Sequence, residues 1–95
     1  MTIAIDFDDT FTADPVLWSA FIKSAKARGH KPMCVTGRRN SEENIDLINA
    51  EFDRWDCQMP VFFCNLSSKV DTMERHGVKI DVWIDDAPLT LVHGH

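Results

Sequence analysis

The chain has 95 residues, of which 44% are hydrophobic and 26% charged, and this balance predicts one globular domain rather than a disordered chain. The formal net charge is −5 and the lysines and arginines form no basic stripe, which argues against a nucleic-acid partner without excluding one. No apolar run approaches the ~20 residues of a membrane span, and Met1–Asp6 lacks a signal-peptide pattern, so we expect a cytoplasmic protein without membrane association.

Strand-like and helix-like segments alternate along the chain. The first strand is predicted over Thr2–Phe7. A helix is predicted to follow, because an aspartate before a proline, here Asp14 and Pro15, is typical of a helix start. Asp14 would cap this helix and Gly29 would end it. The remaining predicted elements are a strand over Lys31–Thr36, a helix from Asn40 or Ser41 to Trp55, a strand over Val61–Cys64, a helix from Ser67 or Ser68 to Gly77, a strand over Ile80–Ile84 and a fifth edge strand over Thr90–Val92.

The order of these elements predicts an α/β fold. Strands that are apolar throughout, such as Met33–Val35, are typical of a parallel sheet buried on both faces. With right-handed crossovers we expect a Rossmann-like, three-layer α/β/α sandwich of four or five strands. The first two helices would cover one face and the short third helix the other. That second face would keep exposed apolar surface, which predicts a homodimer or another partner.

Three further groups of residues have simpler interpretations. Cys34 and Cys64 are expected to be buried in strands as free thiols, and the three tryptophans to lie in the core. His93 and His95 have the H-x-H spacing of a metal-binding pair, but we expect a frayed tail at these positions.

Polar side chains follow each of the first four predicted strands at its carboxyl end. They are Asp6, Asp8, Asp9 and Thr10 after the first strand, Thr36 at the end of the second, Lys69 after the third, and Asp85 and Asp86 after the fourth. In an open parallel sheet this edge is where ligands bind. Two carboxylates ~4 Å apart repel by about 4 kcal/mol near a protein surface, so clustered acids require protons or a cation. Oxygen ligands without clustered His or Cys favour Mg²⁺.

These residues resemble the four motifs of the haloacid dehalogenase (HAD) superfamily. Ile5-Asp6-Phe7-Asp8-Asp9-Thr10 is similar to motif one, an apolar strand ending in D-x-D-x-T. Val35-Thr36-Gly37-Arg38 is similar to motif two, Lys69 to motif three and Trp83-Ile84-Asp85-Asp86 to motif four. The resemblance runs from about Thr2 to Pro88 and implies strand order 3-2-1-4 in a single core domain, with no room for a cap domain.

The resemblance also implies roles for these side chains. Asp6 would be the nucleophile and a Mg²⁺ ligand, and Asp8 the general acid and base, with its backbone carbonyl as a second ligand. Asp85 would be the third protein ligand, and Asp86 would hold a metal-bound water or the lysine, with Asp86 as the alternative primary ligand in place of Asp85. Thr36 would bind the transferring phosphoryl group and Lys69 would stabilise its charge. The candidates for binding the substrate phosphate are Asp9, Thr10, Gly37 and Arg38.

The implied activity is a Mg²⁺-dependent phosphomonoester hydrolase that works through an aspartyl-phosphate. An uncapped site is open to large phosphorylated substrates. A phosphatase that acts on nucleotides or on nucleic-acid ends is therefore a more specific form of the same hypothesis. A HAD-like binding or regulatory module with little turnover is the main alternative. A phospho-accepting receiver domain fits less well, because Cys64-Asn65 stands where its phosphorylated aspartate would end the third strand.

Overall fold

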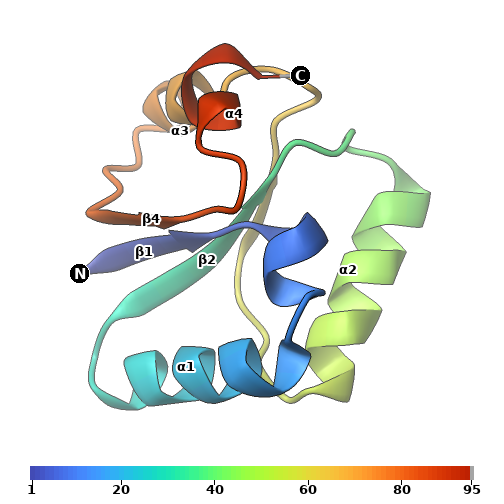
Figure 1. Cartoon of the computed structure of the whole chain (residues 1–95), viewed down its shortest axis with the longest axis vertical. Coiled ribbons are helices and arrows are strands. Elements are labelled where there is room, and N and C mark those ends of the chain that lie inside the picture. Colours follow the sequence, from blue (N-terminus) through green and yellow to red (C-terminus); the bar gives the residue numbers. More distant parts are fainter. Residues whose placement is uncertain (95) are drawn as a thin grey trace.

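The computed structural model describes residues 1–94 and shows an α/β fold around a four-stranded sheet. All pairings are parallel and the strand order is β3-β2-β1-β4, as predicted (Figure 1). The strands are β1 (Thr2–Ile5), β2 (Lys31–Thr36), β3 (Val61–Phe63) and β4 (Val82–Ile84). β1 is central, and its last residue, Ile5, pairs with Cys34 of β2 and Ile84 of β4.

The first three helices begin where the sequence provides capping side chains. The helices are α1 (Pro15–Ala27), α2 (Glu42–Arg54), α3 (Lys69–Arg75) and α4 (Leu89–His93), and a wide turn η1 (Phe7–Phe11) follows β1. The side chains of Asp14, Ser41 and Ser68 each accept a hydrogen bond from a backbone N–H of the first turn of α1, α2 and α3, respectively. The predicted caps of these helices are therefore confirmed.

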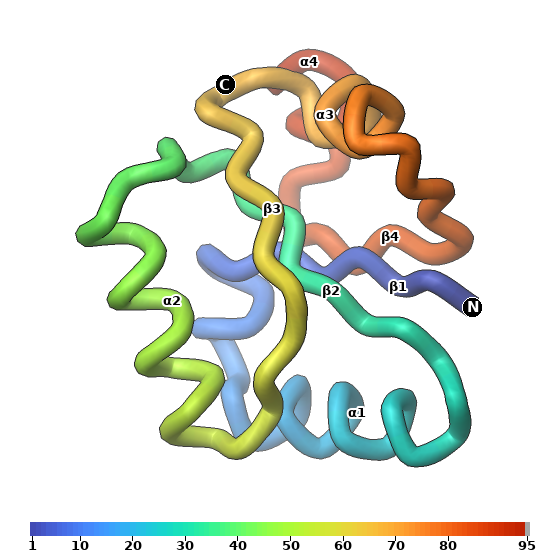
Figure 2. The backbone as a smooth tube through the Cα atoms, turned by 180° about the vertical axis from the view of Figure 1, so that it is seen from behind, coloured from blue at the N-terminus to red at the C-terminus, as the bar shows by residue number. Residues whose placement is uncertain are grey.

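Two hydrophobic clusters lie on opposite faces of the sheet. α1 and α2 lie on one side and α3 and α4 on the other (Figures 1 and 2). The first cluster combines Ile3 and Ile5 with Ile22 of α1 and Phe52 of α2. The second contains Ala4 and Met73 of α3. Because side chains alternate along a strand, the larger residues of β1 face the two long helices and the small Ala4 faces α3.

The predicted fifth strand is wrong. Residues 89–93 form α4, in which Thr90 N and the Thr90 hydroxyl both donate to Ala87 O. The helix packs beside α3, where the Ser68 hydroxyl donates to Leu91 O at 2.7 Å. A three-residue apolar run does not distinguish a strand from a helical turn.

The simpler expectations have mixed outcomes. Cys34, Cys57 and Cys64 are buried free thiols, whereas Trp18, Trp55 and Trp83 are only partly buried against the two clusters. His95 of the terminal histidine pair lies outside the described residues. Within residues 1–94, no helix has the length and hydrophobicity needed to span a bilayer.

Candidate active site

The site forms where β1 and β4 end side by side. The Asp6 amide donates to Ile84 O at 2.9 Å, so the two strands stay paired up to the residues that follow them. Ile5 and Ile84 both contact the cluster beneath α1 and α2. The next residue of each strand, Asp6 and Asp85, therefore turns to the opposite face, where α3 begins. Strand alternation thus brings two carboxylates together from opposite ends of the sequence.

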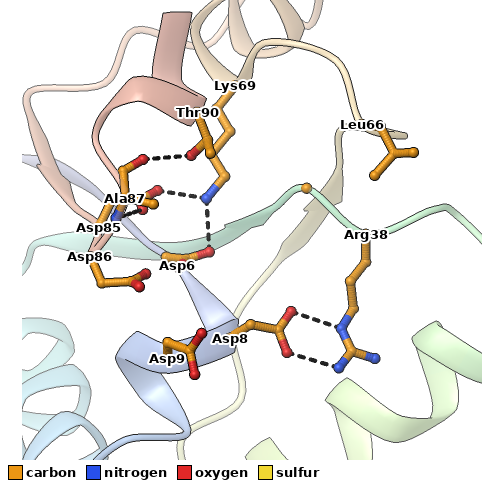
Figure 3. Close-up of a pocket in the computed structure, with 11 residues that line it drawn as sticks. Asp6, Asp8, Asp9, Arg38, Leu66, Lys69, Asp85, Asp86, Ala87 and Thr90 are labelled. Atoms are coloured by element: carbon orange, nitrogen blue, oxygen red, sulfur yellow. Dashed lines mark hydrogen bonds and ion pairs between the residues drawn. The ribbon is translucent and has the colours of Figure 1, made fainter. Parts of the chain in front are cut away.

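Lys69, the first residue of α3, joins these two carboxylates. Its ammonium lies 2.7 Å from Asp6 Oδ1 and 2.5 Å from Asp85 Oδ2 (Figure 3). The Lys69 and Asp85 side chains are each 3% exposed and that of Asp6 is 9% exposed, so these charges are nearly removed from water. The other Asp85 oxygen accepts a hydrogen bond from Ala87 N at 2.9 Å, which fixes that carboxylate.

Burial changes the acidity of this group. The pKa of Asp6 is raised to about 6, because burial raises it more than the hydrogen bond from Lys69 lowers it, and the neighbouring Asp86 contributes to the rise. Burial alone would lower the pKa of Lys69, but its hydrogen bonds to Asp6 and Asp85 raise it above the ordinary value. The lysine is therefore a fixed positive charge, and Asp6 is ionised at neutral pH.

Three carboxylates have the spacing of a metal site. Asp6, Asp85 and Asp86 each offer one oxygen, and these oxygens lie within 4.8 Å of one another. The Thr10 hydroxyl lies 3.3 Å from Asp6 Oδ2 and 3.2 Å from Asp86 Oδ1, and it accepts from Asp86 N. Hard oxygen donors in this number fit Mg²⁺, which keeps several waters and needs few protein ligands.

The structure separates the contacts of the adjacent Asp85 and Asp86. Asp86 was expected to hold a metal-bound water or the lysine, but Lys69 contacts Asp85. Asp86 instead lies on the Thr10 side of the site and is exposed. The two oxygens of Asp6 have different neighbours: Oδ1 accepts a hydrogen bond from Lys69, and Oδ2 faces Thr10 and Asp86.

Asp8 lies apart from this carboxylate group and is paired with Arg38. Arg38 Nη2 lies 2.8 Å from Asp8 Oδ1, and Nε lies 2.9 Å from Oδ2, a bidentate pair at the rim of the cavity (Figure 3). The side chains of Arg38 and Asp8 are 30% and 47% exposed. The Asp8 carboxylate raises the pKa of Arg38. The sequence analysis predicted that Arg38 binds the substrate phosphate and did not predict this pair.

Thr36 and Gly37 lie where β2 ends. The Thr36 side chain is buried, and its hydroxyl accepts a hydrogen bond from Arg38 N at 3.3 Å. Thr36 is not among the residues that line the cavity, whereas Gly37 is. Gly37 O also accepts a hydrogen bond from Leu66 N, which ties the loop after β2 to the loop before α3.

These residues surround an open cavity of about 220 Å³. Three lining residues were missed by the sequence analysis: Leu66 in the loop before α3, Ala87 after β4, and Thr90 of α4. The backbone of Leu66 has a positive φ of 67°, which sequence reasoning did not anticipate for a leucine. Thr90 was missed because its segment was predicted to be an edge strand. The predicted residues that line the cavity are Asp6, Asp8, Asp9, Gly37, Arg38, Lys69, Asp85 and Asp86.

No protein-family model matches this chain, and no curated protein or solved structure matches it in comparison searches. The function is therefore argued from the geometry and chemistry of the site.

Proposed function

We propose that this protein is a Mg²⁺-dependent phosphomonoester hydrolase of the HAD type that acts through an aspartyl-phosphate. The observation that carries the proposal is the environment of Asp6. One of its carboxylate oxygens contacts a buried lysine at 2.7 Å, and the other faces Thr10 near Asp86. A carboxylate between a fixed cation and a set of oxygen ligands is suited to attack a phosphorus atom whose negative charge those groups offset.

Asp6 and Asp86 are the carboxylates that we expect to hold Mg²⁺, with Asp85 nearby. We place Asp85 second because one of its oxygens contacts Lys69 and the other accepts from Ala87 N. When bound, Mg²⁺ would neutralise charge on the phosphoryl oxygens and orient the ester. Asp8 keeps the role that the resemblance implies for its side chain, that of general acid and base.

The proposed reaction has two displacements at phosphorus. In the first, an Asp6 oxygen forms a bond to phosphorus, the bond to the ester oxygen breaks, and the leaving alcohol takes a proton from Asp8, which enters this step protonated on one oxygen and keeps a contact with Arg38 through the other. In the second, water attacks the same phosphorus and gives a proton to Asp8, and the bond to Asp6 breaks. Inorganic phosphate and the alcohol are the products, and both aspartates return to their starting states.

The proposal extends to architecture and location. The hydrophobic clusters on the two faces of the sheet support a three-layer α/β/α sandwich of HAD type. We also propose a cytoplasmic location, since three buried free cysteines suit a reducing compartment. The open cavity suits substrates larger than those an enclosed site would admit, although nothing in its lining identifies one.

The test is release of inorganic phosphate from p-nitrophenyl phosphate and from panels of sugar phosphates, nucleotides and phosphorylated oligonucleotides, with Mg²⁺ and with EDTA. We expect turnover that requires Mg²⁺ and is lost in Asp6→Asn. Turnover that survives this substitution would remove Asp6 as the nucleophile. Binding of Mg²⁺ and phosphate without hydrolysis of any ester would instead support the binding or regulatory module.

A further inference from the structure

We propose that Arg38 and Asn44 are positioning residues that hold the Asp8 carboxyl group in place for proton transfer, rather than residues that bind the substrate phosphate. This inference rests on the proposed function, because it concerns how Asp8 reaches the leaving oxygen and the attacking water. It assigns a role to Asn44, which the four motifs do not include, and it changes the role expected for Arg38.

The Arg38 guanidinium donates hydrogen bonds to other side chains of the protein. Nε and Nη2 contact the two oxygens of Asp8 at 2.9 and 2.8 Å, and Nη1 donates to Asn44 Oδ1 at 2.9 Å. The guanidinium carbon also lies 5.6 Å from the centroid of the Phe7 ring, so one face of the group is against the core. All three nitrogens of the planar group thus have protein acceptors.

Asn44 is itself fixed from two sides. Its backbone N–H donates to the capping Ser41 hydroxyl, and its side-chain amide nitrogen donates to Arg39 O at 2.9 Å. The second contact sets the orientation of the amide, so that its oxygen points at Arg38. A chain of hydrogen bonds therefore runs from the first turn of α2 through Arg38 to the Asp8 carboxylate.

Asp8 needs such support because its own backbone is not part of regular structure. It lies within η1, where it has extended angles (φ −68°, ψ 131°) and is followed by Asp9 in the left-handed region at φ 61°. Its side chain is 47% exposed, and a half-exposed side chain on a turn has freedom that a proton donor and acceptor must lose. The bidentate contact with a held arginine removes that freedom in the ionised form, and one of the two contacts still holds the side chain when the other oxygen carries the proton.

A double-mutant cycle separates the two roles of Arg38. The cycle compares kcat/KM for Asp8→Asn, Arg38→Lys and the double variant. The substrates are p-nitrophenyl phosphate and an alkyl phosphate, whose alcohol leaving group depends more strongly on receiving a proton as it departs. If Arg38 acts through Asp8, Arg38→Lys lowers alkyl phosphate turnover by up to about 10²-fold, lowers that of p-nitrophenyl phosphate less, and adds nothing in the Asp8→Asn background. Asn44→Ala shows the same pattern at about tenfold.

The matched control is Arg39→Ala. Arg39 is the residue next to Arg38, and its side chain is exposed. The substitution removes that positive charge but keeps the backbone carbonyl that accepts a hydrogen bond from Asn44. It should behave as the wild type. The second readout is the affinity for inorganic phosphate with Mg²⁺, which Arg38→Lys should leave unchanged.

Multiplicative losses in the double variant, or an equal loss on both esters together with weaker phosphate binding, would overturn the positioning role and leave the phosphatase intact. A wild type that hydrolyses no ester would overturn both. If Arg38→Lys does not fold, Asn44→Ala and the double variant of Asn44→Ala with Asp8→Asn decide the question.

Discussion

Replacing Asp6 with asparagine should change how the stability of the metal-free protein depends on pH. Burial raises the pKa of Asp6 from 3.8 to about 6 in the folded state. Because the folded carboxyl group holds its proton more tightly than the unfolded one, its contribution to stability is complete below pH 3.8 and is lost as the pH rises through 6. This difference in pKa corresponds to about 3 kcal/mol in the free energy of unfolding.

The assay is urea unfolding of the wild type and Asp6→Asn in EDTA across this pH range. Asparagine has nearly the shape of a protonated aspartate but does not ionise, so the acids that do not interact with Asp6 cancel when the two proteins are compared. The free energy of unfolding of the wild type, relative to the variant, should fall by about 3 kcal/mol between acidic and neutral pH. A difference that is constant, or that grows in favour of the wild type with pH, would refute the reasoning.

Mg²⁺ should reverse this loss, since a cation favours the ionised form of Asp6. At about 100 times its Kd, Mg²⁺ adds about 2.7 kcal/mol to the stability of the wild type near neutral pH. The effect should shrink below pH 4, where Asp6 holds its proton, and should be small in Asp6→Asn at any pH. Equal stabilisation of both proteins would mean that the ion binds elsewhere.

Three other predictions concern Lys69, the motif-four aspartates and oligomeric state. Lys69→Met leaves two buried carboxylates without their cation and should cost about 3–5 kcal/mol of stability in denaturant unfolding, with a smaller loss at acidic pH. Asp86→Asn should weaken Mg²⁺ binding in calorimetry more than Asp85→Asn, and the reverse order would return the ligand role to Asp85. The apolar surface around Val78 and Trp83, which are only partly buried, predicts a homodimer in sedimentation velocity, and a monomer at micromolar concentration would contradict it.

Most of the fold could be predicted from patterns in the sequence. Apolar strands and capped helices indicated the element order, and the parallel sheet placed polar residues from four strand ends at one edge. The patterns did not determine the structure of short segments. Residues 89–93 form a helix that is joined to the start of α3 by the hydrogen bond from Ser68 to Leu91 O, a contact between segments far apart in the chain.

The partner of Lys69 was predictable in principle from strand alternation. Trp83 contacts the cluster beneath α3 and Ile84 the cluster beneath α1 and α2, so Asp85 must point towards α3 and its lysine. The sequence shows the alternation but not which face each side chain takes. The pairing of Asp8 with Arg38 was beyond such reasoning, because both lie in turns whose backbone angles follow no repeating pattern.

The charge of the cavity gives a last prediction, which concerns the order of binding. Five aspartates and two cations line it, a formal charge of −3, and a phosphate ester adds further negative charge. Like charges ~4 Å apart repel by about 4 kcal/mol at the effective dielectric of a protein surface. One divalent cation removes most of this barrier. Inorganic phosphate should therefore bind with Mg²⁺ and show no measurable binding in EDTA by calorimetry. Binding of equal affinity in EDTA would show that phosphate needs no metal ion to overcome the charge of the cavity, and the argument for a metal-dependent site would fail.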